Sequence, residues 1–395
     1  MRTGRVKGQD IMDRRNFLHT GLAATGLATL PFVARAQSAN VAGGIIPIRV
    51  SPPEVFRTTV CLRPCRGAGP RIESEEVGRK QVVHNYGHGG SGWSLSWGSA
   101  AEAVGQAMQN APDKIAVIGA GALGLTAAIT AQRAGAQVTI YAKERFPFVR
   151  SARATGSWTP DSRVAKASEV SSGFPDLWER MARRALTMHQ SFVGLPGNPV
   201  EWLDNYLLRD QPPGQPSGQS SNNNEDPGFI ALEDRLRDVS PHYSAIAPGT
   251  HPFAAPSVRM APHMTFNVAD YSHQLESDFL AAGGRFEAIE FHAPSDLSHL
   301  KEKVIINCTG YGARALWQDN SIVPVRGQIV WLAPQEGVHY GVFYHSLLVL
   351  ARRDGIVVQE VGPNDNFGWN DDNETVDTTA AAAALEKLKT IYASA

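Results

Sequence analysis

A glycine-rich turn between a strand and a helix restricts the fold of this 395-residue chain more than any other feature. Gly119, Gly121 and Gly124 follow the apolar run KIAVI and open the helical run LGLTAAITAQRAG, and QVTIYAKE then predicts a second strand. The first glycine permits a tight turn, the second lets a pyrophosphate approach the backbone, and the third lets the helix pack on the strand. The pattern predicts a βαβ unit that binds a dinucleotide at the helix N-terminus.

Three further residues belong to this predicted nucleotide site. Ala122 and Leu123 lie inside the turn, so their backbone is expected to face the same nucleotide. Glu144 stands about 20 residues beyond the last glycine, where a carboxylate can bind the ribose hydroxyls. The motif fits NAD and FAD equally well, so the choice between them depends on the rest of the chain.

Composition and charge favour a globular protein with a small-molecule ligand. Hydrophobic residues make up 43% of the chain and charged residues 19%, and the net charge of −1 argues against nucleic acid or an anionic membrane as the main partner. The cysteines Cys61, Cys65 and Cys308 make a poor disulfide framework. On one extended segment Cys61 and Cys65 would lie about 13 Å apart, too far to bridge, so free and mostly buried thiols are expected.

The first 36 residues read as a targeting segment. The stretch RRNFL at 14–18 is followed by an apolar run too short to span a bilayer and by the small-residue site ARA at 34–36. Paired arginines before Phe-Leu resemble a twin-arginine signal. We therefore expect export through the twin-arginine machinery to the periplasm or the medium, with no membrane attachment after cleavage.

The remaining chain is a mixture of strands and helices. FRTTVCLR, ending at Arg63, predicts a strand, and a helix is expected from about Ser94 to Asn110. Asn267 opens another helix, and Asp377 opens a terminal one. Further strands are expected at RFEAIEF, KVIINCTG, GQIVWL and GIVVQEV, and the low-complexity stretch 209–228 reads as a solvated loop.

Four stretches resemble segments of the D-amino acid oxidase family. VVHNYGHGGSGWSLSWGSA resembles its carboxy-terminal flavin-binding segment, and KVIINCTGYGARAL with VPVRGQIVWL resembles its middle section. ATGSWTP resembles its loop over the flavin, and CLRPCRGAGPRIE the segment with its substrate-binding arginine. The resemblance implies an α/β fold with a Rossmann-like FAD-binding parallel sheet. An α+β substrate domain, built on a mixed, largely antiparallel sheet, would cover the flavin.

The order of these stretches is rotated relative to the family. The arginine segment and the glycine-rich segment precede the nucleotide motif here, whereas in the family they close the chain, so a circular permutation is expected. Because domain termini are often close together at the surface, a short connector can join them without disturbing the core. Both predicted domains are then discontinuous. The FAD-binding domain takes 64–195 plus 263–323, and the substrate domain takes 37–63 plus 196–262 plus 324–395.

The resemblance also implies roles for individual residues. Arg63 would hold the substrate carboxylate through two parallel hydrogen bonds, with Arg66 as the alternative register. The carbonyl of Gly90 would accept a hydrogen bond from the substrate amine, and any side chain at Gly89 or Gly90 would collide with flavin or substrate. Other residues would contact FAD: Ser91, Gly92, Trp93 and Ser94 at the pyrimidine side, Arg150, Ser151, Thr155 and Gly156 elsewhere on the flavin, and Cys308, Thr309 and Gly310 near the adenine.

The sequence departs from the family at the loop over the substrate. The family carries two tyrosines four residues apart; VFYHSLLVLARRDG supplies Tyr344, but the second position falls on Leu348. One carboxylate contact would then be absent, replaced by His345, or supplied by a repositioned Tyr340. A larger, apolar or non-α-amino substrate becomes an alternative to common D-amino acids.

The resemblance implies an FAD-dependent oxidase acting on a CH–NH2 bond. A hydride would pass from the substrate α-carbon to flavin N5, giving an imino acid, then an oxo acid and ammonia, while oxygen yields hydrogen peroxide. One alternative is a dehydrogenase for amines or amino acids with an acceptor other than oxygen, and another is a non-catalytic flavin-binding protein. No histidine or cysteine stands out as a linkage site, so non-covalent FAD is expected, and no metal.

Overall fold

The structure, a computed structural model, describes residues 44–211 and 228–393. The predicted export signal (1–36) and most of the predicted low-complexity loop (209–228) lie outside the described residues. Within the described part, no helix is long and apolar enough to cross a membrane.

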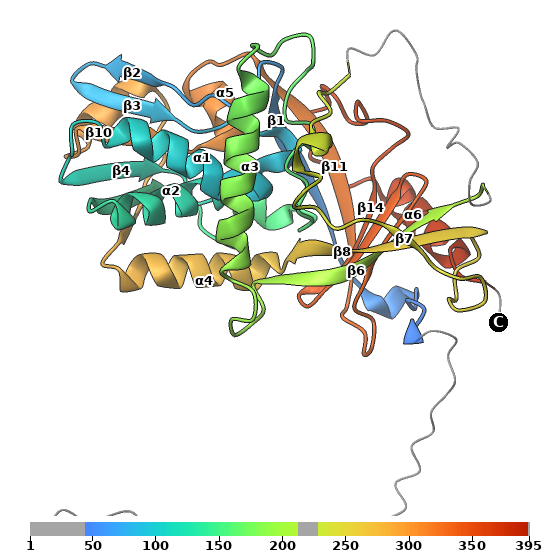
Figure 1. The fold of residues 1–395 in the computed structure, drawn as a ribbon. Coiled ribbons are helices and arrows are strands. Elements are labelled where there is room, and N and C mark those ends of the chain that lie inside the picture. Colours follow the sequence, from blue (N-terminus) through green and yellow to red (C-terminus); the bar gives the residue numbers. More distant parts are fainter. Residues whose placement is uncertain (1–43, 212–227, 394–395) are drawn as a thin grey trace, which may run out of the picture. The chain divides into compact units, whose positions relative to one another are not determined.

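A six-stranded sheet carries the nucleotide motif (Figure 1). Four neighbouring pairs of its strands run parallel and one edge pair is antiparallel. The parallel strands read as continuous apolar runs, which is typical of strands covered on both faces. In spatial order they are β2 (Ser74–Val77), β3 (Lys80–His84), β10 (Val304–Asn307), β4 (Lys114–Ile118), β5 (Gln137–Ala142) and β9 (Arg285–Ala288).

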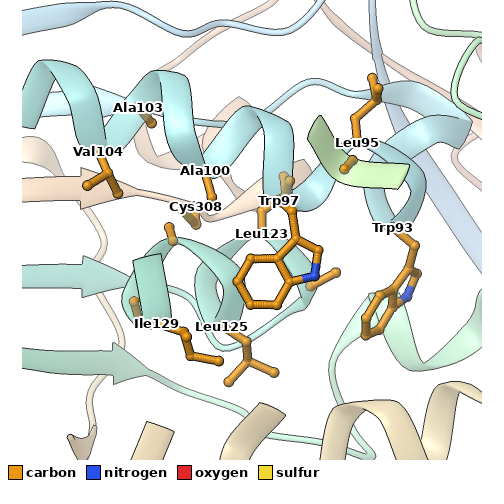
Figure 2. Packing of buried hydrophobic residues seen from close by; sticks show 14 of the residues in the cluster. Trp93, Leu95, Trp97, Ala100, Ala103, Val104, Leu123, Leu125, Ile129 and Cys308 are labelled. Atoms are coloured by element: carbon orange, nitrogen blue, oxygen red, sulfur yellow. The ribbon is translucent and has the colours of Figure 1, made fainter. Parts of the chain in front are cut away.

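Helices pack on one face of this sheet and on one another. Their shared core buries Trp97 and Ala100 of α1 together with Leu123 and Leu125 of α2, and Figure 2 shows these side chains on the two helices. The Trp97 indole N–H donates to the hydroxyl of Tyr271 at 2.8 Å, which fixes α4 to α1. The helices are α1 (Gly92–Ala107), α2 (Ala122–Arg133), α3 (Phe174–Gln190) and α4 (Val268–Ala281).

An eight-stranded sheet forms the second part of the fold. Of its seven neighbouring pairs, only β12–β6 is parallel, so the sheet is mixed and largely antiparallel. In spatial order its strands are β1 (Val55–Arg66), β11 (Ile322–Leu332), β14 (Gly355–Glu360), β13 (Leu347–Arg352), β12 (Gly341–Tyr344), β6 (Val200–Arg209), β8 (Ser257–Phe266) and β7 (Ser244–Ala245). The predicted fold class, α/β with a parallel sheet and a mixed sheet, is confirmed.

The two faces of the eight-stranded sheet have different neighbours. Alternate residues such as Val330 and Val358 pack with Leu388 of α6 (Thr378–Thr390) in one core. The residues between them, such as Ile329 and Val357, form a separate core on the opposite face. Since successive side chains of a strand point to opposite faces, this alternation decides which residues of the sheet can reach a ligand.

The predicted elements and the observed ones agree over most of the chain. The strands and helices expected at 56–63, 94–110, 114–144, 267–281 and from Asp377 are all present with small shifts of their ends. The Asp377 carboxylate accepts from the backbone N–H of Ala380 and caps α6. Helix α3 and strands β6 and β8 were not predicted. The division into two discontinuous domains stays a prediction.

Candidate functional site

A cavity of about 730 Å³ is lined by residues from both sheets. A volume in this range is typical of cofactor and substrate pockets. All but four of the predicted site residues line it; the exceptions are Gly124, Ser91, Ser94 and Tyr344. The predicted residues that the structure brings together there are Arg63, Gly89, Gly90, Gly92, Trp93, Gly119, Gly121, Ala122, Leu123, Glu144, Arg150, Ser151, Thr155 and Gly156.

The nucleotide turn joins β4 to α2 at one end of the cavity. Gly119 has φ +102°, and a Cβ there would lie 2.6 Å from the carbonyl oxygen of Cys308. A Cβ at Gly124 would lie 1.9 Å from the carbonyl oxygen of Gly119. Gly124 therefore serves helix–strand packing, as its place in the motif predicts, and it does not line the cavity.

Two helix N-termini open at the cavity without a side-chain cap. Helix α2 follows Gly121 and α1 follows Ser91, and neither N-cap side chain bonds to the helix. The backbone N–H of Ala122 is hydrogen-bonded to the hydroxyl of Ser151 at 3.2 Å. Each N-terminus presents the positive end of the helix dipole, and the remaining N–H groups can donate, so both favour anionic or electron-rich groups of a ligand.

The glycine-rich segment beside α1 contains glycines of two kinds. A Cβ at Gly89 would lie 1.9 Å from the Arg163 carbonyl oxygen, and one at Gly90 would lie 2.6 Å from the Ser162 hydroxyl. These two glycines are therefore required by contacts within the protein, and the expectation that flavin or substrate also excludes side chains there stays a prediction.

Gly92 is different, because a Cβ there would meet no protein atom within 4 Å. Gly92 is helical, with φ −52° and ψ −49°, and it lines the cavity. A glycine in a helix is less stable than alanine by about 1 kcal/mol, and no protein contact offsets that cost here. A bound group lying against the first turn of α1 would explain why glycine stands at this position. The cavity therefore fits a flat cofactor beside Gly92.

Ser91 and Ser94 hold a loop against the start of α1. The Ser91 hydroxyl donates to the carbonyl of Ser162 at 3.0 Å, and the Ser94 hydroxyl accepts from the backbone N–H of Thr159 at 2.8 Å. Both side chains are buried. They were predicted to line the flavin, but these bonds turn them toward the loop, so they shape the cavity from behind.

The segment after β5, residues 148–157, lines another side of the cavity. The Trp93 indole N–H donates to the carbonyl of Ser151 at 2.9 Å, which ties this segment to α1. At Gly156, with φ +88°, a Cβ would lie 2.5 Å from the carbonyl oxygen of Phe266. Arg150 forms a bidentate ion pair with Glu374, with contacts of 2.8 and 2.7 Å, and both line the cavity.

His88 lies in a buried chain of hydrogen bonds behind the glycine-rich segment. Ser99 donates to the amide oxygen of Asn85 and therefore accepts from His88 Nε2 at 2.7 Å, while the Asn85 amide nitrogen reaches the Cys308 sulfur at 3.7 Å. Burial lowers the pKa of His88 to about 3, so the ring is neutral. Within the described residues no group of three or more His, Cys, Asp or Glu is placed to hold a metal ion.

Arg63 carries a positive charge in the cavity wall without a carboxylate partner in the described part of the chain. Among the described residues its guanidinium makes one hydrogen bond, from Nη1 to the carbonyl of Arg326 at 3.3 Å. Burial, and then the like charge of Arg163, lower its pKa to about 10, so it stays protonated near neutral pH. An anion in the cavity would remove the cost of this uncompensated charge. Arg66, in contrast, lies outside the cavity and pairs with Asp319 at 3.4 Å.

Tyr344 lies outside the cavity, which differs from the prediction. Its hydroxyl donates to Asp210 at 2.6 Å, and its ring packs against the core on the α6 side of the sheet. The two proposed substitutes are also elsewhere. His345 pairs with Asp210 at 3.1 Å, and the Tyr340 hydroxyl donates to the Ile46 carbonyl at 2.7 Å. Strand alternation is the reason, because only the opposite face of the sheet lines the cavity.

The cavity-lining residues of the eight-stranded sheet include two that sequence reasoning missed, Ile329 and Gln359. Leu348, at the expected tyrosine position, lines the cavity as well and pairs directly with Gln359. A polar residue within the apolar run GIVVQEV was the only available sequence signal for Gln359. The three thiols are free; Cys65 and Cys308 are buried and Cys61 partly so, as predicted.

The arrangement matches a known family of flavoproteins. Residues 114–394 match the model of a family described as FAD dependent oxidoreductase. The chain belongs to this family. The match begins at the first residue of β4, so it covers the nucleotide turn and most of the eight-stranded sheet.

Within this FAD-dependent oxidoreductase family, similar curated proteins carry the name D-amino-acid oxidase. One from Streptomyces coelicolor is 29% identical over 228 residues, covering 57% of this chain and 61% of that protein. One from Rubrobacter xylanophilus is 27% identical over 223 residues, covering 55% and 58%. The chain thus spans about three-fifths of the length of these relatives.

A solved structure of similar fold is the glycine oxidase from Geobacillus kaustophilus. It superposes with a TM-score of 0.50 at 15% sequence identity, covering 71% of this chain and 78% of that one. At this identity the likeness establishes the fold of this FAD-dependent oxidoreductase.

Proposed function

We propose that the chain is an FAD-dependent oxidase that acts on the CH–NH2 bond of an amino acid, with Arg63 as the carboxylate anchor. The observation that carries this proposal is a charged guanidinium in the wall of a cavity that also holds the nucleotide turn, without a carboxylate partner in the described residues. The naming of similar proteins as D-amino-acid oxidases supports the same substrate class.

The cavity residues fit both a dinucleotide and an amino acid. The turn from Gly119 to Leu123 and the N-terminus of α2 would hold the pyrophosphate, and Glu144 would bind the ribose hydroxyls. The first turn of α1, at Gly92, would lie against the flavin. When bound, FAD would accept the hydride that leaves the substrate α-carbon and pass its electrons to oxygen, giving hydrogen peroxide.

The residues of the chain would bind and orient the substrate. Arg63 would take the carboxylate through two parallel hydrogen bonds, which fixes the direction of the α-carbon as well as its position. The Gly90 carbonyl would accept a hydrogen bond from the amine. The amine loses a proton as the α-carbon loses its hydride, and water then converts the imino acid to an oxo acid and ammonia.

Replacement of Arg63 by methionine tests the anchor, with Arg66→Met as a matched control on the same strand. We expect R63M to lower kcat/KM for D-amino acids by about 100-fold or more, because two charge-assisted hydrogen bonds are lost. R66M should leave kcat/KM within about threefold, since Arg66 binds Asp319 outside the cavity. The proposal fails if R63M retains the wild-type kcat/KM.

The acceptor is tested by the hydrogen peroxide formed per substrate consumed. An oxidase yields one peroxide for each amino acid oxidised, whereas a dehydrogenase yields little and needs another acceptor. A holoprotein whose flavin absorbance is not bleached by any amino acid or amine under anaerobic conditions would instead support a non-catalytic flavoprotein.

We also infer a circular permutation relative to the D-amino acid oxidase family. In the unpermuted order, α6 would run on into the segment before β1, so those two regions must lie close together. The Tyr340 hydroxyl contacts both of them, the Ile46 carbonyl at 2.7 Å and the Tyr392 hydroxyl at 2.8 Å.

A chain reordered to begin at Lys114, with residues 393 and 44 joined by a short linker, should bind as much FAD as the natural order. Loss of FAD from a folded product would contradict the inference.

Two further proposals complete the function. FAD would be non-covalent, because burial raises the pKa of Cys308 to about 12 and also raises that of Cys61, which keeps both cavity thiols protonated and unreactive. Flavin that stays with acid-precipitated protein would contradict this.

Export by the twin-arginine machinery rests on residues 1–36, and replacement of Arg14 and Arg15 by lysine should retain the protein inside the cell.

A further inference from the structure

Gln359 presents an unused hydrogen-bond donor to the cavity. The residue is 2% exposed and lines the cavity from β14. The Thr155 hydroxyl donates to its amide oxygen at 2.6 Å, which turns the amide nitrogen the other way. That nitrogen has no hydrogen-bond partner among the described residues. An amide nitrogen carries two N–H donors, and on this cavity-lining residue they are available to a guest that carries an acceptor.

The sheet register places Gln359 close to Arg63. The Arg63 guanidinium lies over Gly327, where a Cβ would be 2.5 Å from Nη2. Gly327 stands two residues before Ile329 on β11 and faces the same side, and Ile329 pairs directly with Gln359. Gly327 and Gln359 are therefore diagonal neighbours on adjacent strands, at a separation of about 7–8 Å. A small carboxylate can bridge the two side chains that stand over these positions.

The other neighbour of Gln359 explains why a donor is needed. Gln359 pairs with Leu348 of β13, whose side chain is apolar and also lines the cavity. Tyr344, His345 and Tyr340 bind groups outside the cavity. Among the described residues in this part of the sheet, Gln359 therefore supplies the free N–H donors that lie beside Arg63.

We propose that Gln359 is a specificity-determining residue whose amide N–H donates to the substrate carboxylate held by Arg63. The inference rests on the proposed function of Arg63 as the anchor. Because the amide is neutral, the charge balance of the guanidinium and the carboxylate is preserved while a second direction of approach is fixed. Gln359 thus selects substrates that carry a carboxylate over amines that lack one.

Binding of propionate, measured by calorimetry on the full-length holoprotein, tests this assignment. Propionate carries the carboxylate without the reacting amine, so it reports on the carboxylate site alone. Gln359→Met keeps the size of the side chain and removes both donors, and we expect it to weaken propionate binding about tenfold. Arg63→Met should weaken it by about 100-fold or more, because the charge is lost as well.

The outcomes separate this inference from the proposed function. If the wild-type protein binds propionate, R63M abolishes this binding and Q359M leaves it unchanged, the role of Gln359 is overturned and the anchor role of Arg63 stands. Absence of propionate binding to the wild-type protein would overturn both. Gln359→Glu is the second variant, in case Q359M does not fold, and at pH 8 its carboxylate should repel propionate and weaken binding by more than tenfold. Binding to Q359E as tight as to the wild type would again overturn the inference.

Steady-state kinetics give an independent readout. The carboxylate contact is the same before and during hydride loss, so Q359M should raise KM by about tenfold with kcat nearly unchanged. A merely structural role would lower the amount of active protein, and hence kcat, without changing KM. The two results are distinguishable in one titration of substrate.

Discussion

The two walls of the cavity are built in opposite ways. The wall on the six-stranded sheet includes short runs of neighbouring residues, 119–123 together with Gly89, Gly90, Gly92 and Trp93, and acts through backbone groups and helix N-termini. The wall on the eight-stranded sheet depends instead on side chains that different strands bring together, among them Arg63, Ile329, Leu348 and Gln359. The first wall therefore depends on the absence of Cβ atoms at certain points, and the second depends on strand register. Substitutions should affect the two walls differently.

The largest effect is expected from Gly89→Ala in the first wall. The new Cβ would lie 1.9 Å from the Arg163 carbonyl oxygen, and the backbone at Gly89 has φ +57°, which alanine adopts unfavourably. We expect the free energy of unfolding, measured with urea, to fall by about 3 kcal/mol or more. Gly105→Ala in α1, where a Cβ meets nothing, is the control and should be neutral or stabilising by about 1 kcal/mol. Equal stability of G89A and wild type would show that the wall is not closed by its backbone.

The second effect is a loss of stability in acid that arises from two histidines close to the cavity. Burial lowers the pKa of His88, behind the glycine-rich segment, to about 3, and that of His263, bound to Ser157, to about 4. In the unfolded chain both histidines bind a proton below about pH 6.5, whereas in the folded chain they do not. Their contribution to the free energy of unfolding is therefore fully present above about pH 6.5 and is lost as the pH drops. Each histidine should remove about 2 kcal/mol between pH 7 and pH 5.

Urea unfolding at pH 7 and pH 5 measures this dependence. His88→Gln can still donate to Ser99 and should lose about 2 kcal/mol less than the wild type over that interval. If H88Q loses as much free energy of unfolding as the wild type between pH 7 and pH 5, His88 is protonated in the folded protein at pH 5.

The smallest effect is expected from Gly92→Ala, which sharpens the contrast with Gly89. Because no protein atom is near the new Cβ, the apoprotein should keep its stability or gain about 1 kcal/mol. FAD should bind about tenfold more weakly, since the methyl group projects into the cavity where the flavin is proposed to lie. Titration of the apoprotein with FAD checks this. Unchanged FAD affinity would place the flavin away from the first turn of α1.

The difference between the walls also explains which parts of the site could be predicted. The nucleotide turn was readable because three glycines at fixed spacing perform three separate steric tasks within one turn. Gly124 shows this well, since its contact with Gly119 lies within the motif itself. The reason for Gly89 and Gly90 could not be read in the same way, because the atoms that exclude their side chains belong to Ser162 and Arg163, about 70 residues later.

The second wall shows where sequence reasoning stops. Tyr344 and Leu348 are four residues apart, but a hairpin turn lies between them, and they end on opposite faces of the sheet. Gln359 could not be assigned from the sequence, because its place beside Arg63 follows from the pairing of β14 with β11. Position in the chain does not specify this pairing.

The sequence by itself determined the βαβ unit, the nucleotide turn, the α/β class with two kinds of sheet, and the candidate anchor Arg63. These follow from local periodicity, from glycine geometry and from resemblance over short segments. The tertiary structure decided which side chains meet in the cavity: it brought Gln359 to Leu348 and Arg63, and it turned Tyr344 toward α6. The physical reason is that a strand presents alternate residues to opposite faces, so the register between distant strands chooses the neighbours of each side chain.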